Sequence, residues 1–555
     1  MSRSVSHSGH KTIALPPFAG LYITRFNECR VVIATSVVLE SNSFRRQVCA
    51  NLRKGTLTVP NSILRTQAFA SLVLASILSV AQQNPQTQTP QRPTPAPIPV
   101  KEVDLDAVRP DPQIAEALKQ ISAERIQATI EKLVTFKNRN TLSSNDQEMI
   151  SQGLGVTAAA KWIQEELERY AQACGGCLQV KTDSFTQPVA PRVPAPTPLT
   201  NVYAVLQGSD PENAKRIYLV TGHYDSRNSD TLNTKDSAPG ANDDASGTAV
   251  SLECAHVLSK YKFPATLIFL AVAGEEQGLD GAKHFAQMAR EQGWQIQGVL
   301  NNDIVGGNTT PGDTQQRKDT VRVFSEGIPA SAKPEDITRI RNLGGENDSP
   351  SRELARYIRT TVKEYLPQFQ PTLIFRRDRF LRGGDHTAFN EEGFAGVRFT
   401  EYREDFNHQH QNVRTENGIE YGDVLKFVDF SYVANVARVN AATLASLASA
   451  PAPPANVRID TRGLTNDTTL TWEAAPGGLT RQYQILWRNA DQPYWQHAMN
   501  APAASTSVTL PISKDNVMFA LRSIDAKGHA SLPVVPRPSG RIDVPGRAAA
   551  ASSGM

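Results

Sequence analysis

The polar stretch 221–247 carries two groups of side chains that could bind a metal ion. His223 and Asp225 directly follow an apolar, strand-like stretch, and their i, i+2 spacing points both side chains to the same face of an extended chain. A carboxylate beside a histidine can fix the tautomer of the ring while the other ring nitrogen binds metal. Asp243 and Asp244 directly precede a predicted helix, where one carboxylate would be enough to cap the helix. We therefore interpret this stretch as the first half of a two-zinc hydrolase site.

Glu275 and Glu276 form a second acidic pair, directly after the apolar stretch 265–272. Adjacent carboxylates at the end of a buried strand repel one another unless a cation or a proton relieves the repulsion. A metal centre would relieve it, because one carboxylate binds the metal and the other stays free as a base. A solvated acidic turn is the alternative, and the apolar strand that precedes the pair argues against it.

Further candidates lie downstream. Asp303 follows another apolar stretch, and His386 stands between a Gly-Gly-Asp sequence and Thr-Ala-Phe. His408 and His410 lie in a polar segment that follows the strand-like residues 397–400. Each of these residues alone could be an ordinary loop residue. Taken with the two acidic pairs, they indicate one site, because most of them follow strands or open helices at the same edge of a predicted sheet.

These side chains need a sheet to bring them together. The unbroken apolar character of residues 265–272 is typical of a central parallel strand that is covered on both faces. Predicted strands alternate with predicted helices, which indicates an α/β sandwich with a mixed sheet. In such sheets ligands bind at the carboxyl ends of the strands. The predicted strands are 201–206, 216–220, 265–272, 298–301 and 395–400, and the predicted helices include 156–173, 246–260, 282–291 and 352–365.

The order of these motifs resembles that of the two-zinc aminopeptidases. The motifs are H-x-D, G-A-x-D-D-A-S-G, E-E-x-G-L, N-x-D and a late histidine. This family also includes glutamate carboxypeptidase and, with altered metal content, glutaminyl cyclase. The resemblance covers roughly residues 122–448 and is densest in 201–307. It implies the mixed-sheet α/β/α sandwich of the zinc exopeptidase type, two zinc ions as cofactors and a peptide or protein substrate.

The resemblance also implies a role for each motif residue. His223 and Asp303 would bind one zinc ion, Glu276 and the late histidine would bind the other, and Asp243 would bridge the two. The two zinc ions would activate a water molecule, and Glu275 would act as its general base.

Three other positions follow from the same resemblance. We prefer His410 as the late histidine, because the family usually has Asp-Thr four residues after this histidine and Arg414-Thr415 follows His410 at that spacing. The arginine departs from the family's pattern, which leaves His408 as the alternative. Asp225 would act in catalysis as the partner that orients the first histidine. His386 matches an Asp-His pair beside the family's substrate pocket, so we expect it to face the substrate.

With 555 residues, the chain is long enough for several domains. An apolar stretch at 68–81 is too short to span a bilayer, and Ser79 and Ala81 are small residues of the kind that signal peptidase reads, so cleavage before Gln82 is expected. Because this segment lies far from Met1, we hypothesise that translation starts near Val59. The predicted organisation is an N-terminal extension at 1–81 with a signal-peptide-like segment at 62–81, a Pro/Gln-rich linker at 82–112, a zinc peptidase domain at 113–448, a linker at 449–455, a fibronectin type III-like domain at 456–540 and a tail at 541–555.

Composition restricts the partners. The chain has 58 basic and 55 acidic residues, which gives no support for nucleic-acid binding or for binding to a membrane surface. Cys174 and Cys177 flank two glycines, and no second cysteine pair follows at the spacing of a zinc knuckle, so we predict a local disulfide. With the signal segment, this places the protein in the secreted, periplasmic or extracellular class, with no stable membrane insertion after signal cleavage.

The C-terminal part is predicted to be a small all-β sandwich. Alternating patterns at 468–472, 483–487, 507–510 and 517–523 are typical of strands, and Trp472 and Trp487 would pack between two sheets. This part resembles a fibronectin type III domain. We expect the Pro-rich segment 449–454 to be a hinge, and the domain to attach the enzyme to a surface or large substrate, or to serve as a spacer.

We therefore expect a secreted zinc aminopeptidase. A carboxypeptidase is an alternative, because four arginines precede His386 and could bind a substrate carboxylate, although a solvated basic loop explains them equally well. Glutaminyl cyclase is another alternative on the same scaffold. A non-catalytic binding ectodomain is least favoured, because such a protein would be expected to lose ligands that this chain keeps. The four arginines are Arg376, Arg377, Arg379 and Arg382.

Overall fold

The computed structural model describes residues 21–26, 29–34, 96–105 and 110–539. The chain divides into two units, residues 1–90 and residues 91–555. In the first unit, β1 (Leu21–Phe26) pairs antiparallel with β2 (Cys29–Ala34). The predicted signal segment, the predicted start near Val59 and the C-terminal tail lie outside the described residues.

The second unit is built on an eight-stranded mixed sheet with the order β3-β4-β6-β5-β7-β10-β8-β9. The strands β6, β5, β7 and β10 run parallel to one another at its centre, which confirms the predicted fold class. Strand β6 is buried along its whole length, as its apolar sequence predicts. The strands are β3 (Leu178–Gln187), β4 (Thr197–Leu206), β5 (Arg216–His223), β6 (Thr266–Val272), β7 (Gln295–Asn302), β8 (Val321–Ser325), β9 (Thr372–Ile374) and β10 (Gly396–Glu401).

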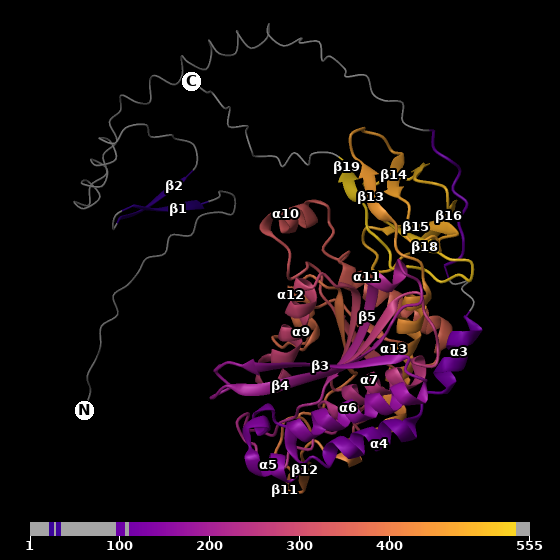
Figure 1. Cartoon of the computed structure of the whole chain (residues 1–555). Coiled ribbons are helices and arrows are strands. Elements are labelled where there is room, and N and C mark those ends of the chain that lie inside the picture. The colour runs from indigo at the N-terminus through magenta and orange to yellow at the C-terminus, as the bar shows by residue number, and fades with distance from the viewer. Residues whose placement is uncertain (1–20, 27–28, 35–95, 106–109, 540–555) are drawn as a thin grey trace, which may run out of the picture. The chain divides into compact units, whose positions relative to one another are not determined.

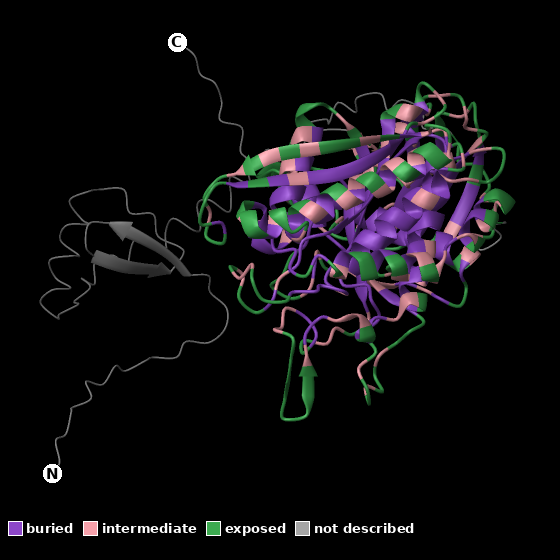
Figure 2. Cartoon of the chain, turned by 60° about the horizontal axis from the view of Figure 1, so that its bottom comes forward, coloured by how far each residue is buried: buried purple, intermediate pink, exposed green. Residues whose placement is uncertain are grey.

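Helices cover both faces of this sheet (Figure 1). One face carries α4 (Ala123–Val134), α6 (Gly155–Ala173), α7 (Ala245–Leu258), α11 (Pro350–Tyr365) and α13 (Phe430–Ser449), and the other carries α9 (Asp280–Glu291) and α12 (His386–Glu391). Helix α7 contacts β5 on one side and α4 and α13 on the other, so almost every residue in it is buried. Figure 2 shows the resulting layering, with buried central strands and exposed loops and outer helix faces. Shorter helices are α3 (Pro112–Lys119), α5 (Gln147–Ser151), α8 (Glu275–Gly278) and α10 (Pro334–Asn342).

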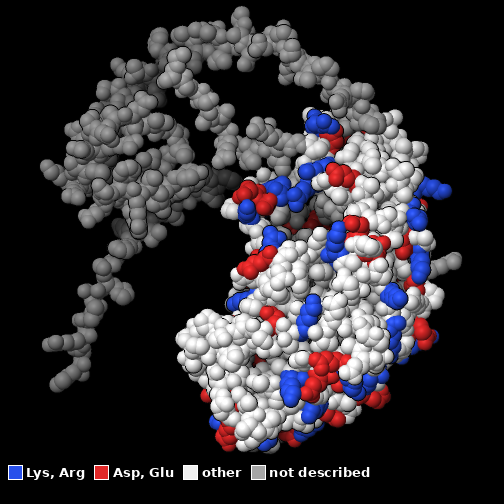
Figure 3. All heavy atoms as spheres, in the orientation of Figure 1, with Lys and Arg blue, Asp and Glu red and all other residues white. Residues whose placement is uncertain are grey.

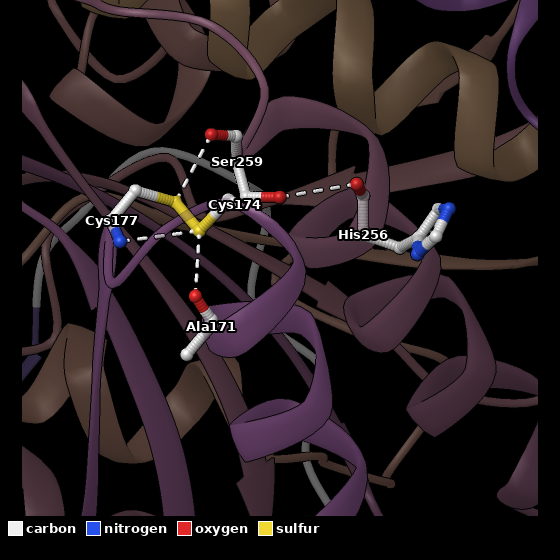
Figure 4. Close-up of a disulfide and its surroundings, with 5 residues drawn as sticks. All are labelled: Ala171, Cys174, Cys177, His256 and Ser259. Carbon is white, nitrogen blue, oxygen red and sulfur yellow. Dashed lines mark hydrogen bonds between the residues drawn. A yellow bond between two sulfur atoms is a disulfide. The ribbon is translucent and has the colours of Figure 1, made fainter.

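The end of α6 is joined to β3 by the predicted disulfide between Cys174 and Cys177 (Figure 4). Gly175 and Gly176, which lie between the two cysteines, both have a positive φ, a backbone conformation that residues with a Cβ atom rarely adopt. The Cys177 sulfur lies 3.1 Å from the carbonyl oxygen of Ser259, just beyond α7. The disulfide therefore fixes the turn that starts the edge strand of the sheet.

The C-terminal module, residues 455–539, is a sandwich of two sheets, with strand orders β17-β14-β13-β19 and β16-β15-β18. Trp472 and Trp487 are both buried in its core, as predicted. Its resemblance to a fibronectin type III domain stays a prediction. The strands are β13 (Ala455–Asp460), β14 (Thr468–Glu473), β15 (Gln482–Asn489), β16 (His497–Pro502), β17 (Ser507–Leu510), β18 (Val517–Ile524) and β19 (Arg537–Ser539).

The expectation of a hinge at 449–454 is not met. Ala450 and Ala452 are buried, and Arg216 donates a hydrogen bond of 2.7 Å from Nη2 to the Ala450 carbonyl oxygen. The hinge expectation rested on proline and alanine content alone, and such residues also pack well against an apolar surface. The module is therefore docked on the peptidase domain through its own linker.

The segment 96–105 also lies on the C-terminal module. The Ile98 amide donates to the Thr509 carbonyl oxygen at 2.9 Å, and the Val103 amide donates to the Ala498 carbonyl oxygen at 2.9 Å. Part of the predicted Pro/Gln-rich linker is thus held along strands of this module.

On the face of the molecule shown in Figure 3, basic and acidic side chains are interspersed. Among the described residues, no helix is both long and apolar enough to cross a membrane. Two further short strands, β11 (Arg414–Glu416) and β12 (Ile419–Tyr421), form an exposed hairpin.

Candidate metal centre

The first of two groups that could hold a metal ion consists of His223, Asp243 and Asp303. His223 ends β5, Asp303 follows the neighbouring parallel strand β7, and Asp243 lies just before α7. The His223 Nε2 atom lies 3.2 Å from Asp243 Oδ1 and 4.0 Å from Asp303 Oδ1. All three side chains are buried. Two adjacent strand ends and one helix start therefore converge, as expected for a parallel sheet.

The second group consists of Asp243, Glu276 and His410. The His410 Nε2 atom lies 2.7 Å from Asp243 Oδ2 and 2.9 Å from Glu276 Oε1. Asp243 belongs to both groups, and one of its oxygens faces each of them. The structure therefore brings together the residues that the resemblance implied as ligands, with Asp243 in the shared position.

Asp225 connects the first group to the acidic pair. Its Oδ1 lies 3.4 Å from Nδ1 of His223, and its two oxygens accept hydrogen bonds from the amides of Glu275 and Glu276 at 3.2 and 3.1 Å. Thr141 donates a third hydrogen bond, of 3.0 Å, to Oδ2. Burial raises the pKa of Asp225, but the bond with His223 and these donors outweigh burial, so that the net shift is downward.

Asp244 has a supporting position. It caps α7 by accepting a hydrogen bond from the Gly247 amide at 2.9 Å, as expected from the sequence. It also accepts hydrogen bonds from the His223 amide at 3.0 Å and the Ile304 amide at 3.2 Å. This one carboxylate fixes the backbone beside two of the candidate ligands.

The charges and orphaned atoms of the centre fit a bound metal ion. The His223 Nε2 and Glu276 Oε1 atoms are buried, and despite their short contacts with Asp243 and His410 neither makes a hydrogen bond of good geometry in the described part of the chain. Burial, with added repulsion from Asp303 and Glu276, raises the pKa of Glu275 well above its usual range. Cations between these carboxylates would remove the repulsion and supply the missing partners. Imidazole and carboxylate ligands together are a donor set that zinc takes.

His408 lies apart from both groups. Its ring stacks on Phe427 with ring centroids 3.5 Å apart, and its Nδ1 lies 3.3 Å from Asn308 Oδ1. The geometry therefore supports His410 and not His408 as the late histidine.

His386 is enclosed by protein, and its expected role beside the substrate stays a prediction. Its ring is fully buried at the start of α12, with Nε2 2.8 Å from the Arg377 carbonyl oxygen and 3.6 Å from Asp378 Oδ2. Burial lowers the pKa of His386 to about 4, against the opposing effect of Asp378. The contact between the His386 ring and the Arg377 carbonyl ties the loop before α12 to the first turn of that helix.

Sequence reasoning missed three charged residues at the centre. Arg398 of β10 is fully buried, and its Nη2 lies 2.7 Å from Asp303 Oδ1. Asp385 is also fully buried, and neither of its carboxylate oxygens has a hydrogen-bond partner among the described residues. Arg227 contacts Glu276 and His410. Asp385 could have been found from the sequence, since it stands directly before His386. The two arginines could not, because the ligands that they contact are distant from them in sequence.

Comparison with known proteins assigns the chain to a family. The model of "Peptidase family M28" matches residues 201–429. A probable zinc metalloprotease of Leptosphaeria maculans is 44% identical over 437 residues, which cover 78% of this chain and 99% of the relative. Another, from Pyrenophora teres f. teres, is 44% identical over 440 residues, which cover 79% of this chain and 89% of the relative. The crystal structure of the Legionella pneumophila LapA aminopeptidase is similar at 19% identity with a TM-score of 0.43, covering 65% of this chain and 80% of that chain. On the family match and the identity across nearly the whole of the first relative, this chain belongs to peptidase family M28.

Proposed function

We propose that this peptidase is a zinc-dependent exopeptidase that removes N-terminal residues from peptides. The observation that carries the proposal is the pair of metal groups that share Asp243, in which every side chain but the partly exposed His410 is buried. Relatives with 44% identity are described as probable zinc metalloproteases, and the donor set suits zinc. The first zinc ion is assigned to His223, Asp243 and Asp303, and the second to Asp243, Glu276 and His410.

Bound zinc ions would polarise the scissile carbonyl and make a water molecule more acidic. Glu275 takes a proton from the attacking water and passes it to the leaving amine. Asp225 orients the His223 ring and holds the backbone of Glu275 in place. The role proposed for Glu275 is the one that the motif resemblance implies, and the contacts of Asp225 with His223 and with the Glu275 amide support it.

The arginines before His386 give little support for a carboxypeptidase. Three of the four are paired with glutamates, and Arg376 lies over the exposed ring of Phe380 at 5.3 Å. A substrate ammonium group needs a hydrogen-bond acceptor outside the two metal groups, and Asp385 is buried there with neither carboxylate oxygen hydrogen-bonded among the described residues. The pairs are Arg377 with Glu391, and Arg379 and Arg382 with Glu404.

A substrate panel tests the proposal. The zinc-loaded protein is assayed with free aminoacyl peptides, N-blocked peptides and N-terminal glutaminyl peptides, each with and without chelator. We expect hydrolysis of the free aminoacyl peptides alone, and its loss with chelator. Cleavage of N-blocked peptides only would reject an aminopeptidase in favour of a carboxypeptidase-like enzyme, and cyclisation without hydrolysis would indicate a glutaminyl cyclase.

We also infer that the protein is exported. The signal-like segment and the Cys174–Cys177 disulfide support export, because disulfides persist in oxidising compartments. The mature protein should begin at Gln82, and a mature N-terminus within residues 1–58 would contradict this. The fibronectin type III-like module, docked through a buried linker, is best explained as a fixed spacer or attachment site.

A further inference from the structure

Arg227 joins two of the three residues of the second metal group. It lies two residues beyond Asp225, and its side chain is only 15% exposed. The Arg227 Nε atom donates a hydrogen bond of 2.8 Å to Glu276 Oε2, and Nη2 lies 2.6 Å from Nδ1 of His410. One planar guanidinium thus reaches both side chains from the loop that follows β5.

These contacts determine which atoms remain for a metal ion. With Oε2 of Glu276 bound to Arg227, Oε1 is the oxygen that faces His410, and it is a buried atom without a hydrogen-bond partner among the described residues. Nη2 of Arg227 also lies against Nδ1 of His410, but a guanidinium can only donate hydrogen bonds, so this contact limits where the ring can lie and does not fix the tautomer that binds metal through Nε2. The Nε2 atom faces Asp243 and Glu276. Arg227 therefore selects Oε1 of Glu276 as the donor atom for a metal ion and contacts the ring of His410 beside it.

His410 is not held in place by a helix or strand of its own. His410 has a positive φ of 55° and lies outside the described helices and strands. Its loop is tied to the loop of Arg227 by a second contact, because Ser229 Oγ donates to Asn412 Oδ1 at 2.7 Å. In the first group, by contrast, His223 ends a central strand, and Asp303 is paired with Arg398 from the adjacent strand.

We propose that Arg227 is the positioning residue of the second metal group and sets the affinity of that group for zinc. The inference rests on the proposed two-zinc function and concerns only the Asp243–Glu276–His410 half of the centre. Residues that orient metal ligands in this way typically change metal affinity by about 10–100-fold when they are replaced.

The test is a competitive zinc titration of the purified full chain against a chromophoric chelator. For Arg227→Met we expect one zinc ion to bind as in the wild type and the other to bind about 10–100-fold more weakly. The zinc affinity of Arg227→Lys should lie between those of the wild type and Arg227→Met, because an ammonium group cannot reach both ligands at once. The kcat of Arg227→Met should recover with excess zinc, with little change in KM.

Arg403→Met is the matched control. Arg403 is about half exposed, pairs with Asp313 at 3.1 Å and contacts neither metal group, so its removal should leave both zinc affinities unchanged. Wild-type affinity for both ions in Arg227→Met, stronger binding, or equal weakening of both ions would overturn the proposal. If Arg227→Met does not fold, unchanged binding in Arg227→Lys overturns it in the same way. If the wild type binds two zinc ions but releases no N-terminal residue, the proposed function fails while this inference stands.

Discussion

A single carboxylate, Asp225, holds together parts of the centre that come from three segments of the chain. It contacts the ring of His223, the hydroxyl of Thr141 and the amides of Glu275 and Glu276. The general base and a metal ligand are thus positioned through their backbone, and their side chains stay free for chemistry. Preorganisation of this kind costs nothing at the moment of reaction.

The first prediction concerns Glu275. Replacing it by glutamine keeps the size of the side chain but removes its ability to accept a proton, so kcat should fall by about 10²–10⁴-fold. Zinc content should stay at about two ions per chain, because Glu275 is in neither metal group. Elemental analysis and steady-state kinetics check this, with Glu291→Gln on the exposed end of α9 as the control. Retained activity in Glu275→Gln would remove it from this role.

Most of the candidate metal ligands could be predicted from the sequence, because each lies next to a strand or helix with a clear local pattern. His223, Asp243, Glu276 and Asp303 each stand at the end of an element with a clear pattern, so their convergence follows from the sheet. The position of His386 could not be foreseen, because its burial depends on the packing of α12.

At the scale of elements, Glu326 links β8 to α11. It follows β8 directly, its carboxylate accepts a hydrogen bond of 2.9 Å from the Ala330 amide, and its carbonyl accepts one of 2.6 Å from Ser349 Oγ, the cap of α11. Burial raises the pKa of Glu326 from 4.5 to about 7, although the Ala330 amide opposes the shift. The folded protein therefore holds a proton here that the unfolded chain loses at lower pH.

The second prediction follows from this proton. Between about pH 4.5 and 7 the unfolded chain binds fewer protons at Glu326 than the folded protein, so this residue's contribution to stability declines as pH rises. Glu326→Gln should remove a decline on the order of 1–3 kcal/mol across this range. Denaturant unfolding of the zinc-loaded variant and wild type at several pH values measures it. Glu335→Gln, at an exposed position of α10, should leave the pH profile of the wild type unchanged.

Elements with a strong period were predicted well, and irregular or weakly patterned ones were not. The central strands β5, β6 and β7 contain runs of consecutive apolar residues, since helices cover both faces of the sheet, whereas β10 alternates apolar and polar residues although it is buried. The edge strand β3 alternates in burial and carries charged residues, and the three-residue strand β9 is too short to show a period.

At the scale of the whole molecule, buried charges join the C-terminal module to the peptidase domain. Arg488 Nη2 lies 2.5 Å from Asp348 Oδ1, and Trp495 donates from Nε1 to Glu353 Oε2 at 2.9 Å. The side chains of Asp348 and Glu353 are each 2% exposed. Arg356 of α11 pairs with both carboxylates, and Arg488 and Trp495 of the module supply further partners, so the module and helix α11 stabilise each other.

The third prediction is that Trp495→Ala destabilises the whole unit by about 2–4 kcal/mol, since it removes packing and leaves a buried Glu353 oxygen without its donor. Calorimetry of the zinc-loaded protein should show one transition that moves to lower temperature. The control is Leu464→Ala. Leu464 is a fully exposed residue of the same module, so this substitution should alter the free energy of unfolding by less than about 0.5 kcal/mol. Two separate transitions in the wild type would contradict this interdependence.

Residues 96–105 and β19, which begin and end the described part of this unit, both belong to the C-terminal module. A mechanical load applied between these two places therefore passes through the small sandwich and bypasses the sheet that carries the metal ligands. An enzyme anchored at either end could be pulled without distorting its metal centre.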